Sequence, residues 1–166
     1  MYIALDYGII NACRGGFMVK TIKIVTLDDM ETFATNIARH LFPGFLLCLS
    51  GDLGAGKTTF TKYLGKAMGI KETITSPTFT IMNTYESTLD LHHIDAYRLT
   101  KLEDEYTLED AIYSQGVTVI EWYENIVLGL PKEYLSIEIR FEGNQERTLV
   151  IKGRGVYETI VKALIY

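Results

Sequence analysis

The chain has 166 residues, of which 48% are hydrophobic and 22% charged, values that suit one folded domain and exclude a disordered or collagen-like protein. The 16 Lys and Arg residues against 21 Asp and Glu residues give a net charge of −5, which argues against tight, autonomous binding to nucleic acid. Cys13 and Cys48 form no CxxC pair or Cys/His cluster, and no apolar run reaches the ~20 residues that span a bilayer. We therefore expect a cytoplasmic protein in a reducing compartment, without disulfides, zinc or membrane contact.

The first 17 residues differ from the rest of the chain. Residues 11–16 show no periodicity and end in a glycine pair, whereas a strand-like apolar run begins directly after Met18. A secretory signal would need a basic region and a longer apolar stretch, and this segment has neither. We therefore assign residues 1–17 to an N-terminal extension of uncertain status and residues 18–166 to the working domain.

Strand and helix patterns alternate through most of the domain. Asp28, with Glu31 three residues later, predicts the start of the first helix. In chain order, the patterns predict a strand over 19–25, an amphipathic helix with its apolar stripe over 30–41, a buried strand over 45–49, a helix over 57–68, short strands over 81–85 and 91–95, a helix over 102–113 and a buried strand over 117–120.

The last third of the chain has a different pattern. Apolar residues alternate with polar ones from Leu135 to Phe141, which predicts a strand with one wet face. Gly143 and Asn144 then turn the chain into a second strand over 147–152, and a helix follows over 156–164. Together the patterns predict a three-layer α/β domain with a mixed, mostly parallel sheet and an antiparallel C-terminal hairpin.

The strongest functional motif is GDLGAGKT at residues 51–58, which matches G-x-x-x-x-G-K-[ST] in full. The motif follows a predicted buried strand and opens a predicted helix, as a phosphate-binding loop (P-loop) requires, so the three-layer domain is predicted to be a P-loop NTPase fold. Lys57 would reach the β- and γ-phosphates, and the Thr58 hydroxyl would bind Mg²⁺. The expected nucleotide-binding residues are Asp52, Leu53, Gly54, Ala55, Gly56, Lys57, Thr58 and Thr59.

A P-loop site also needs a carboxylate at the end of a neighbouring strand. Glu121 ends the apolar strand over 117–120, and Asp95 ends the more polar strand over 91–95. Strand carboxyl ends collect ligands in parallel sheets. Either acid could hold Mg²⁺, directly or through water, while the other orients the attacking water; the pattern favours Glu121 as the metal ligand.

The identity of the nucleotide rests on motifs that the sequence lacks. It has no Asn-Lys-x-Asp guanine motif and no Asp-x-x-Gly switch motif, so ATP is favoured over GTP. A small-molecule kinase is a rival interpretation, but such kinases clamp the transferred phosphoryl group with several arginines. Of six arginines here, only Arg98 adjoins a candidate carboxylate.

Four segments together resemble the TsaE family, whose members take part in making threonylcarbamoyladenosine in tRNA. They are the P-loop over 51–59, TSPTF at 75–79, HIDAYR at 93–98 and the run over 116–122 that ends in Glu-Trp. The resemblance extends from about Val19 to the C-terminus. It implies an ATPase that binds ATP and Mg²⁺, acts with TsaD and TsaB-like partners, and contacts tRNA only through that complex.

The resemblance also implies roles for individual residues. Lys57 is expected to be catalytic, Thr58 and Glu121 to bind the metal, and Asp95 to be a catalytic or water-orienting acid. Glu121 and Trp122 are expected to be required for catalysis. The segment over 76–79 would be a switch-type loop in which Thr78 senses the γ-phosphate and metal.

Two neighbours of these residues stay ambiguous at the level of sequence. His93 is interpreted as a packing or capping residue. Arg98 either stabilises γ-phosphate charge or pairs with Asp95 or Glu103. Three functions are kept as hypotheses: an ATPase in a tRNA-modifying complex, a nucleotide-dependent switch with incidental hydrolysis, and a small-molecule kinase.

Overall fold

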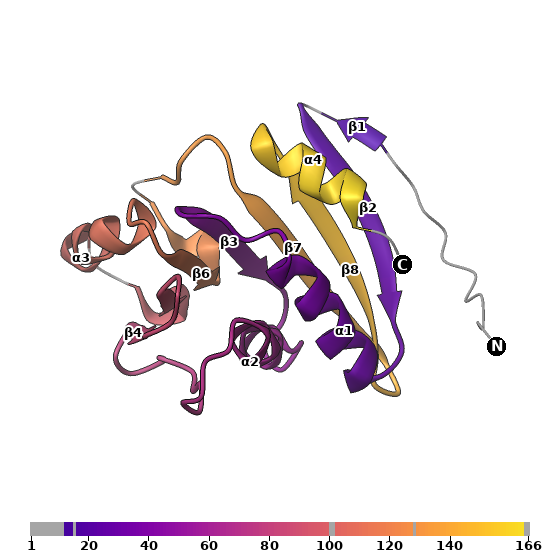
Figure 1. Cartoon of the computed structure of the whole chain (residues 1–166), viewed down its shortest axis with the longest axis horizontal. Helices are drawn as coiled ribbons and strands as arrows, with labels where there is room; N and C mark the ends of the chain where they lie inside the picture. The colour runs from indigo at the N-terminus through magenta and orange to yellow at the C-terminus, as the bar shows by residue number, and fades with distance from the viewer. Residues whose placement is uncertain (1–11, 15, 100–101, 128, 165–166) are drawn as a thin grey trace.

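The computed structural model describes residues 12–14, 16–99, 102–127 and 129–164, which form one mixed sheet with helices on both faces (Figure 1). In chain order, the strands are β1 (Ala12–Arg14), β2 (Phe17–Ile24), β3 (Phe45–Ser50), β4 (Met82–Tyr85), β5 (Leu91–Asp95), β6 (Val117–Glu121), β7 (Leu135–Gly143) and β8 (Glu146–Gly153). The helices are α1 (Leu27–Ala38), α2 (Lys57–Ala67), α3 (Leu102–Ile112) and α4 (Val156–Ala163), with short 3-10 helices η1 (Ala96–Arg98) and η2 (Tyr123–Asn125). These bounds agree closely with the predicted elements, apart from β1.

The strand β1 lies inside the predicted N-terminal extension and pairs antiparallel with β2. Residues 1–11 and 15 of that extension lie outside the described ranges. The domain boundary at residue 18 therefore stays a prediction, although the described sheet begins six residues earlier, at Ala12.

The sheet has the order β1-β2-β8-β7-β3-β6-β5-β4. Its central strand β3 pairs in parallel with β6 and β7, and β5 pairs in parallel with β6. The other four pairings between described strands, β1-β2, β2-β8, β7-β8 and β4-β5, are antiparallel. The three-layer α/β fold with a mixed sheet and an antiparallel C-terminal hairpin is confirmed, but the sheet is less parallel than predicted because β1, β2 and β4 all join antiparallel neighbours.

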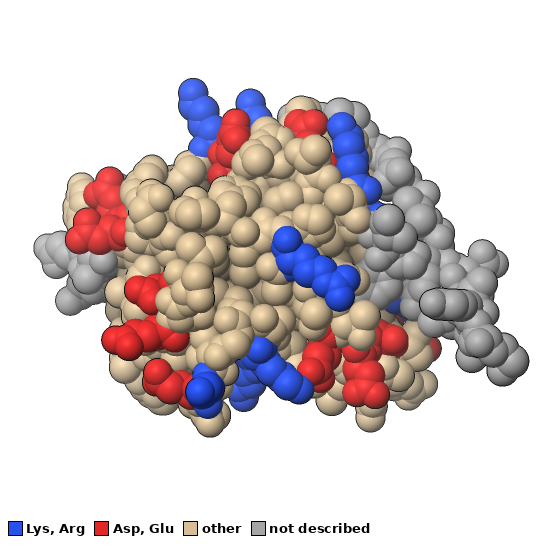
Figure 2. All heavy atoms as spheres, in the orientation of Figure 1, with Lys and Arg blue, Asp and Glu red and all other residues tan. Residues whose placement is uncertain are grey.

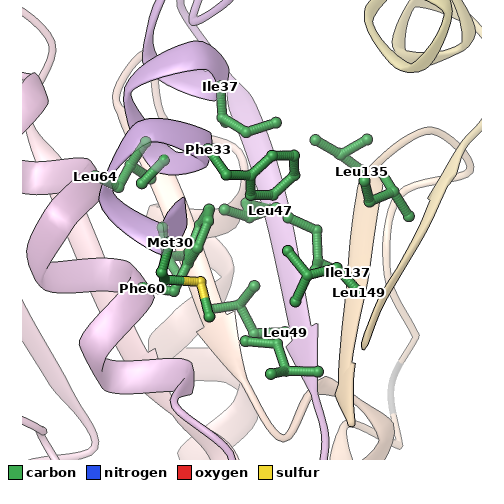
Figure 3. Close-up of a cluster of buried hydrophobic side chains, with 14 of the residues drawn as sticks. Met30, Phe33, Ile37, Leu47, Leu49, Phe60, Leu64, Leu135, Ile137 and Leu149 are labelled. Atoms are coloured by element: carbon green, nitrogen blue, oxygen red, sulfur yellow. The ribbon is translucent and has the colours of Figure 1, made fainter. Parts of the chain in front are cut away.

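The sheet separates two apolar cores because side chains on β3 alternate between its faces. Phe45, Leu47 and Leu49 belong to the core under α1, α2 and α4, whereas Leu46 and Cys48 belong to the core under α3. Figure 3 shows the larger core, with Met30, Phe33, Ile37, Leu47, Leu49, Phe60, Leu64, Leu135, Ile137 and Leu149 labelled. Because both faces of β3 are packed, the carboxyl end of this strand is held firmly where the P-loop begins.

The helix α1 begins differently from the prediction. Its N-cap residue is Thr26, whose hydroxyl accepts a hydrogen bond from the Asp29 N–H at 3.1 Å, while the Asp29 carboxylate accepts one from the Thr26 N–H at 2.8 Å. This reciprocal capping box replaces the predicted Asp28–Glu31 pair, which lies two residues further along. The start of α1 is thereby fixed directly after the end of β2.

The side chain of Phe141 in the hairpin is exposed, although the predicted alternation would bury it. The alternation along β7 places Phe141 on the buried face, yet this residue is 55% exposed. The pairing of β7 with β8 shifts register between Phe141 and Gly143, and such a bulge turns the end of a strand away from its core. The Phe141 ring instead lies 5.5 Å from the Arg147 guanidinium carbon.

Charged side chains of both signs are interspersed over the face shown in Figure 2, largely around its edge. This mixture agrees with the net charge of −5. In the part of the chain that the structure describes, no helix combines the length and apolar character needed to cross a membrane.

Candidate functional site

The loop between β3 and α2 has a backbone that few residues allow. Gly51 has φ +133°, and a Cβ atom there would lie 2.2 Å from the Ile139 carbonyl oxygen, so glycine is required at this position. Gly56 is the N-cap residue of α2, and no described side chain caps the N–H groups that begin this helix. These N–H groups and the positive end of the helix dipole are thus available to an anion.

The Lys57 side chain folds back over the loop. Its Nζ donates hydrogen bonds to the carbonyl oxygens of Gly51 at 2.6 Å and Asp52 at 2.9 Å. Burial lowers the pKa of Lys57, while nearby carboxylates, Glu121 foremost, oppose that shift. An ammonium group binds a phosphate oxygen more strongly than a neutral carbonyl, so this cation can exchange its loop contacts for a phosphate.

The next residue, Thr58, meets the carboxylate at the end of β6. The Thr58 Oγ1 donates to Glu121 Oε2 at 3.0 Å, and the Glu121 side chain is buried. Parallel register places Glu121 beside Leu49 of β3, one residue before the strand's end. A hydroxyl and a carboxylate oxygen at this separation are a pair of hard ligands of the kind that Mg²⁺ uses beside nucleotide phosphates.

The second carboxylate, Asp95, is the register partner of Glu121 on β5. Its Oδ2 accepts hydrogen bonds from Thr78 Oγ1 at 2.8 Å and Ser76 Oγ at 3.2 Å, and its Oδ1 accepts one from the Tyr97 N–H at 3.0 Å. The two hydroxyl oxygens lie 2.6 Å apart. Asp95 therefore ties the predicted switch-type loop to the end of β5.

The far end of that loop is strained. Ile81 has φ +66°, a left-handed conformation that a β-branched residue rarely adopts. Its N–H donates to the Pro77 carbonyl at 2.7 Å, and its own carbonyl accepts from the Asp95 N–H at 2.9 Å. The loop is thus held by Asp95 through its backbone at Ile81 as well as through the hydroxyls of Ser76 and Thr78.

Trp122 follows Glu121 in a left-handed conformation with φ +58° and ψ +39°. Its N–H donates to the Leu49 carbonyl at 2.9 Å, which continues the pairing of β6 with β3 for one residue. The Lys57 Nζ lies 3.7 Å from the centroid of the indole ring, a cation–π contact, and the Tyr97 ring lies 5.0 Å from it. The turn after β6 thus brings the indole to the P-loop lysine.

These residues surround one cavity of about 200 Å³. It is lined by Leu53, Gly54, Gly56, Lys57, Thr58, Thr59, Ser76, Thr78, Asp95, Glu121 and Trp122. All four predicted catalytic residues and both predicted metal ligands therefore come together, although their roles stay predictions. Of the predicted nucleotide-binding residues, Asp52 and Ala55 lie outside the lining: the Asp52 carbonyl accepts from Lys57, and Ala55 is buried beneath the loop.

Two residues near the site have contacts that sequence reasoning did not predict. His93 is fully buried, and its Nε2 lies 2.7 Å from Glu121 Oε1. Arg147 of β8 donates from Nε to the Ala55 carbonyl at 2.8 Å. The two-residue spacing of His93 from Asp95 put both side chains on one face of a predicted strand and could have placed His93 beside the site. No comparable sequence signal pointed from Arg147 to the P-loop.

Arg98 contacts the aromatic ring of Phe79, and its two predicted roles stay predictions. Its guanidinium carbon lies 4.8 Å from the centroid of the Phe79 ring, and Phe79 is 87% exposed. Both side chains lie at the far end of the TSPTF and HIDAYR segments, outside the cavity lining. The contact joins the predicted switch-type loop to η1.

The residues of the cavity fit a nucleoside triphosphate with Mg²⁺. The uncapped start of α2 and the Lys57 ammonium offer positive charge to phosphate oxygens, and Thr58 with Glu121 offers hard oxygen ligands to a divalent cation. Lys57 and Thr58 would exchange their present partners, the loop carbonyl oxygens and Glu121, for the phosphates and the cation.

Comparison with known proteins identifies relatives of the chain. The family model described as "Threonylcarbamoyl adenosine biosynthesis protein TsaE" matches residues 24–149. A protein of Treponema pallidum named for tRNA threonylcarbamoyladenosine biosynthesis is 42% identical over 126 residues, covering 74% of this chain and 93% of that protein. Its namesake in Bacillus subtilis is 39% identical over 150 residues, covering 88% and 95% of the two chains.

The structural comparison agrees with the sequence comparison. The crystal structure of YdiB from Bacillus subtilis superposes with a TM-score of 0.77 at 34% sequence identity, covering 89% of this chain and 95% of YdiB. The matched family model spans the P-loop, the switch-type loop and both carboxylates, so the resemblance inferred from four short segments is confirmed over most of the domain. The chain belongs to the TsaE family.

Proposed function

We propose that the protein is a cytoplasmic, Mg²⁺-dependent ATPase that serves the biosynthesis of threonylcarbamoyladenosine in tRNA. The observation that carries this proposal is the 3.0 Å contact between Thr58 Oγ1 and Glu121 Oε2, made at the mouth of a complete P-loop. It joins the motif that binds phosphates to the carboxylate that would bind the metal. Membership of the TsaE family supports the biosynthetic assignment.

Each side chain has a defined task in this proposal. Lys57 would leave the carbonyl oxygens of Gly51 and Asp52 and bind the β- and γ-phosphates. The Thr58 hydroxyl and the Glu121 carboxylate would hold Mg²⁺, which when bound neutralises charge on the phosphate oxygens. Asp95 would orient the attacking water once its Oδ2 releases the hydroxyl of Thr78.

The proposed partners are those that the resemblance to the TsaE family implies. TsaD and TsaB-like proteins would carry out threonylcarbamoyl transfer, and tRNA would contact this chain only through them. The net charge of −5 supports an indirect contact, because direct binding to the phosphate backbone needs clustered positive charge.

Nucleoside analysis of bulk tRNA from cells depleted of the protein tests the proposal. We expect threonylcarbamoyladenosine to fall on depletion and to recover with the wild-type chain but not with Lys57→Ala. Lys66→Ala is the matched control, since Lys66 is an exposed lysine of the same helix, paired with Glu31 at 2.6 Å. An unchanged level of the modified nucleoside would refute the function and leave an ATPase or small-molecule kinase without a known substrate.

A second candidate function is favoured by the contacts of the switch-type loop. Asp95 holds Ser76 and Thr78 where a γ-phosphate would arrive, and the strained Ile81 ends the same loop. A nucleotide-dependent switch, in which ATP binding moves this loop and hydrolysis is incidental, fits that arrangement. Glu121→Ala separates the two functions: the modification survives loss of hydrolysis if the protein is a switch, and is lost if turnover is required.

A further inference from the structure

His93 is a fully buried histidine that the proposed mechanism leaves without a task. It lies on β5, and its side chain has no exposed surface. Its Nε2 is 2.7 Å from Glu121 Oε1, a distance typical of a strong hydrogen bond to a carboxylate. This contact links the interior of the sheet to a proposed metal ligand.

The register of two parallel strands creates the contact. His93 pairs with Val119 and Asp95 with Glu121, so the four side chains lie on the same face of β5 and β6. That face is the one covered by α2, whose second residue is Thr58. His93 therefore lies one step further into the core than the two carboxylates, directly behind Glu121.

The surroundings of the ring indicate which nitrogen carries the proton. Nδ1 is buried and has no hydrogen-bond partner among the described residues. A bare acceptor is tolerated in such a place more often than an unpaired N–H group. The geometry thus favours Nε2 as the nitrogen that donates to Glu121.

The two oxygens of the Glu121 carboxylate have partners of different kinds. Oε1 accepts from His93 inside the core, and Oε2 accepts from the Thr58 hydroxyl, which lines the cavity. A hydroxyl can rotate toward a cation and leave Oε2 free, whereas among the described residues the buried imidazole hydrogen-bonds to Glu121 alone. One oxygen is therefore fixed and the other is exchangeable.

We propose that His93 is a positioning residue that fixes the Glu121 carboxylate so that Oε2 faces the metal position beside Thr58. The inference rests on the proposed Mg²⁺-dependent function, because it assigns the geometry of that same site. Outer hydrogen-bond partners of metal ligands commonly change metal affinity by about 10- to 100-fold. Substitution of His93 should therefore weaken the binding of Mg²⁺ more than the binding of the nucleotide.

Two variants of His93 test this role. His93→Leu removes the N–H donor at similar volume, and His93→Gln can keep a donor near the position of Nε2. His92→Leu is the matched control, because His92 is the adjacent histidine on the opposite face of β5, where its Nδ1 lies 3.1 Å from Thr84 Oγ1. For each variant, the Mg²⁺ concentration that gives half-maximal ATP hydrolysis is compared with the affinity for ADP in excess EDTA.

We expect His93→Leu to raise the half-maximal Mg²⁺ concentration about tenfold or more, with metal-free ADP affinity unchanged within about twofold. His93→Gln should recover most of the loss, and His92→Leu should resemble the wild type. A His93→Leu variant with unaltered Mg²⁺ dependence overturns the inference. The inference is also overturned if His93→Leu loses as much affinity for ADP in EDTA as for Mg²⁺, since equal losses indicate a general structural role.

A metal-free and nucleotide-free measurement separates this inference from the proposed function. In the nitrogen-15 NMR spectrum of the protein alone, Glu121→Gln should shift the His93 Nε2 resonance, whereas substitution of the exposed Glu124 by Gln should not. If the wild type shows no Mg²⁺-dependent hydrolysis, the proposed function fails. The spectrum alone then shows whether His93 hydrogen-bonds to Glu121. If Glu121→Gln leaves the chemical shift of His93 Nε2 unchanged, the positioning role is overturned in either case.

Discussion

The two halves of the sheet serve the site in different ways. The parallel strands β3, β5 and β6 all end at one edge, where they deliver the P-loop, Asp95 and Glu121 to a single cavity. The antiparallel hairpin β7–β8 contributes no side chain to the lining of that cavity. It contacts the P-loop from behind, through the Ile139 carbonyl against Gly51 and through Arg147 on the Ala55 carbonyl.

The parallel strands thus carry the groups proposed to react, whereas the hairpin supports the backbone of the P-loop. Groups on the parallel half would touch phosphate, metal or water, so their loss should remove activity and leave the fold largely intact. Groups on the hairpin hold the backbone of the loop, so their loss should change stability and affinity before it changes the chemical step. Substitutions chosen in matched pairs from each half can break or sharpen this division.

The largest effect is expected from Glu121→Gln on the parallel half. The amide keeps the shape of the side chain but removes the negative charge that would attract Mg²⁺. Loss of such electrostatic stabilisation costs up to about 4 kcal/mol, or ~10³-fold in rate. Steady-state ATP hydrolysis measures it, with urea unfolding as the check on stability. Glu124→Gln, an exposed change three residues further along, should retain full activity. Retention of more than about a tenth of wild-type activity by Glu121→Gln would contradict this role.

A somewhat smaller effect is expected where the two halves meet, at Gly51→Ala. The added methyl group would overlap the Ile139 carbonyl oxygen, 2.2 Å away, and the φ of +133° disfavours any side chain. Overpacking and backbone strain together should lower the free energy of unfolding by about 3 kcal/mol. Urea titration followed by circular dichroism measures the loss. Gly54→Ala is the control: its φ of +79° is strained, but the new Cβ would meet no atom within 4 Å, and it should cost only about 1 kcal/mol.

The parallel half was easier to predict from sequence than the hairpin. The P-loop motif and the acids at strand ends have fixed chemical tasks, so residue type and order sufficed to bring Lys57, Asp95 and Glu121 together. Alternation predicted the hairpin's strands and turn, but the register shift that exposes Phe141 depends on pairing with β8. The contact of Arg147 with Ala55 joins residues 92 positions apart, and such a contact follows only from the packed fold.

A moderate effect is expected from Arg147→Met on the hairpin. The change removes the hydrogen bond from Nε to the Ala55 carbonyl, and hydrogen bonds of charged groups are worth about 1.5 kcal/mol or more. We expect a loosened P-loop and an affinity for ATP about tenfold weaker, with the maximal rate at saturating ATP nearly unchanged. Isothermal titration calorimetry and steady-state kinetics separate the two quantities. A fall in the maximal rate at unchanged affinity would place Arg147 in the chemical step and break the division between the halves.

The smallest effect is expected from Arg140→Met, which also serves as the control for Arg147→Met. Arg140 lies on β7 in a surface ion pair, with its Nε 2.7 Å from Glu138 Oε1. The hydrogen bond from Arg140 lowers the pKa of Glu138 below the ordinary value of 4.5, so the pair stabilises the fold above that pH and the contribution is lost as pH falls through the folded-state pKa. Because both side chains are partly exposed and screened by solvent, we expect a loss of only about 0.5 kcal/mol at pH 7.

Urea unfolding at a series of pH values checks the sign of that effect. The difference between Arg140→Met and the wild type should shrink as the pH falls below 4.5 and should also shrink in 1 M salt. ATP affinity should stay unchanged, since neither Arg140 nor Glu138 lines the cavity. If Arg140→Met weakened ATP binding as much as Arg147→Met, the whole hairpin would act on the P-loop through its rigidity. The single contact between Arg147 and Ala55 could then no longer explain how the antiparallel half supports the site.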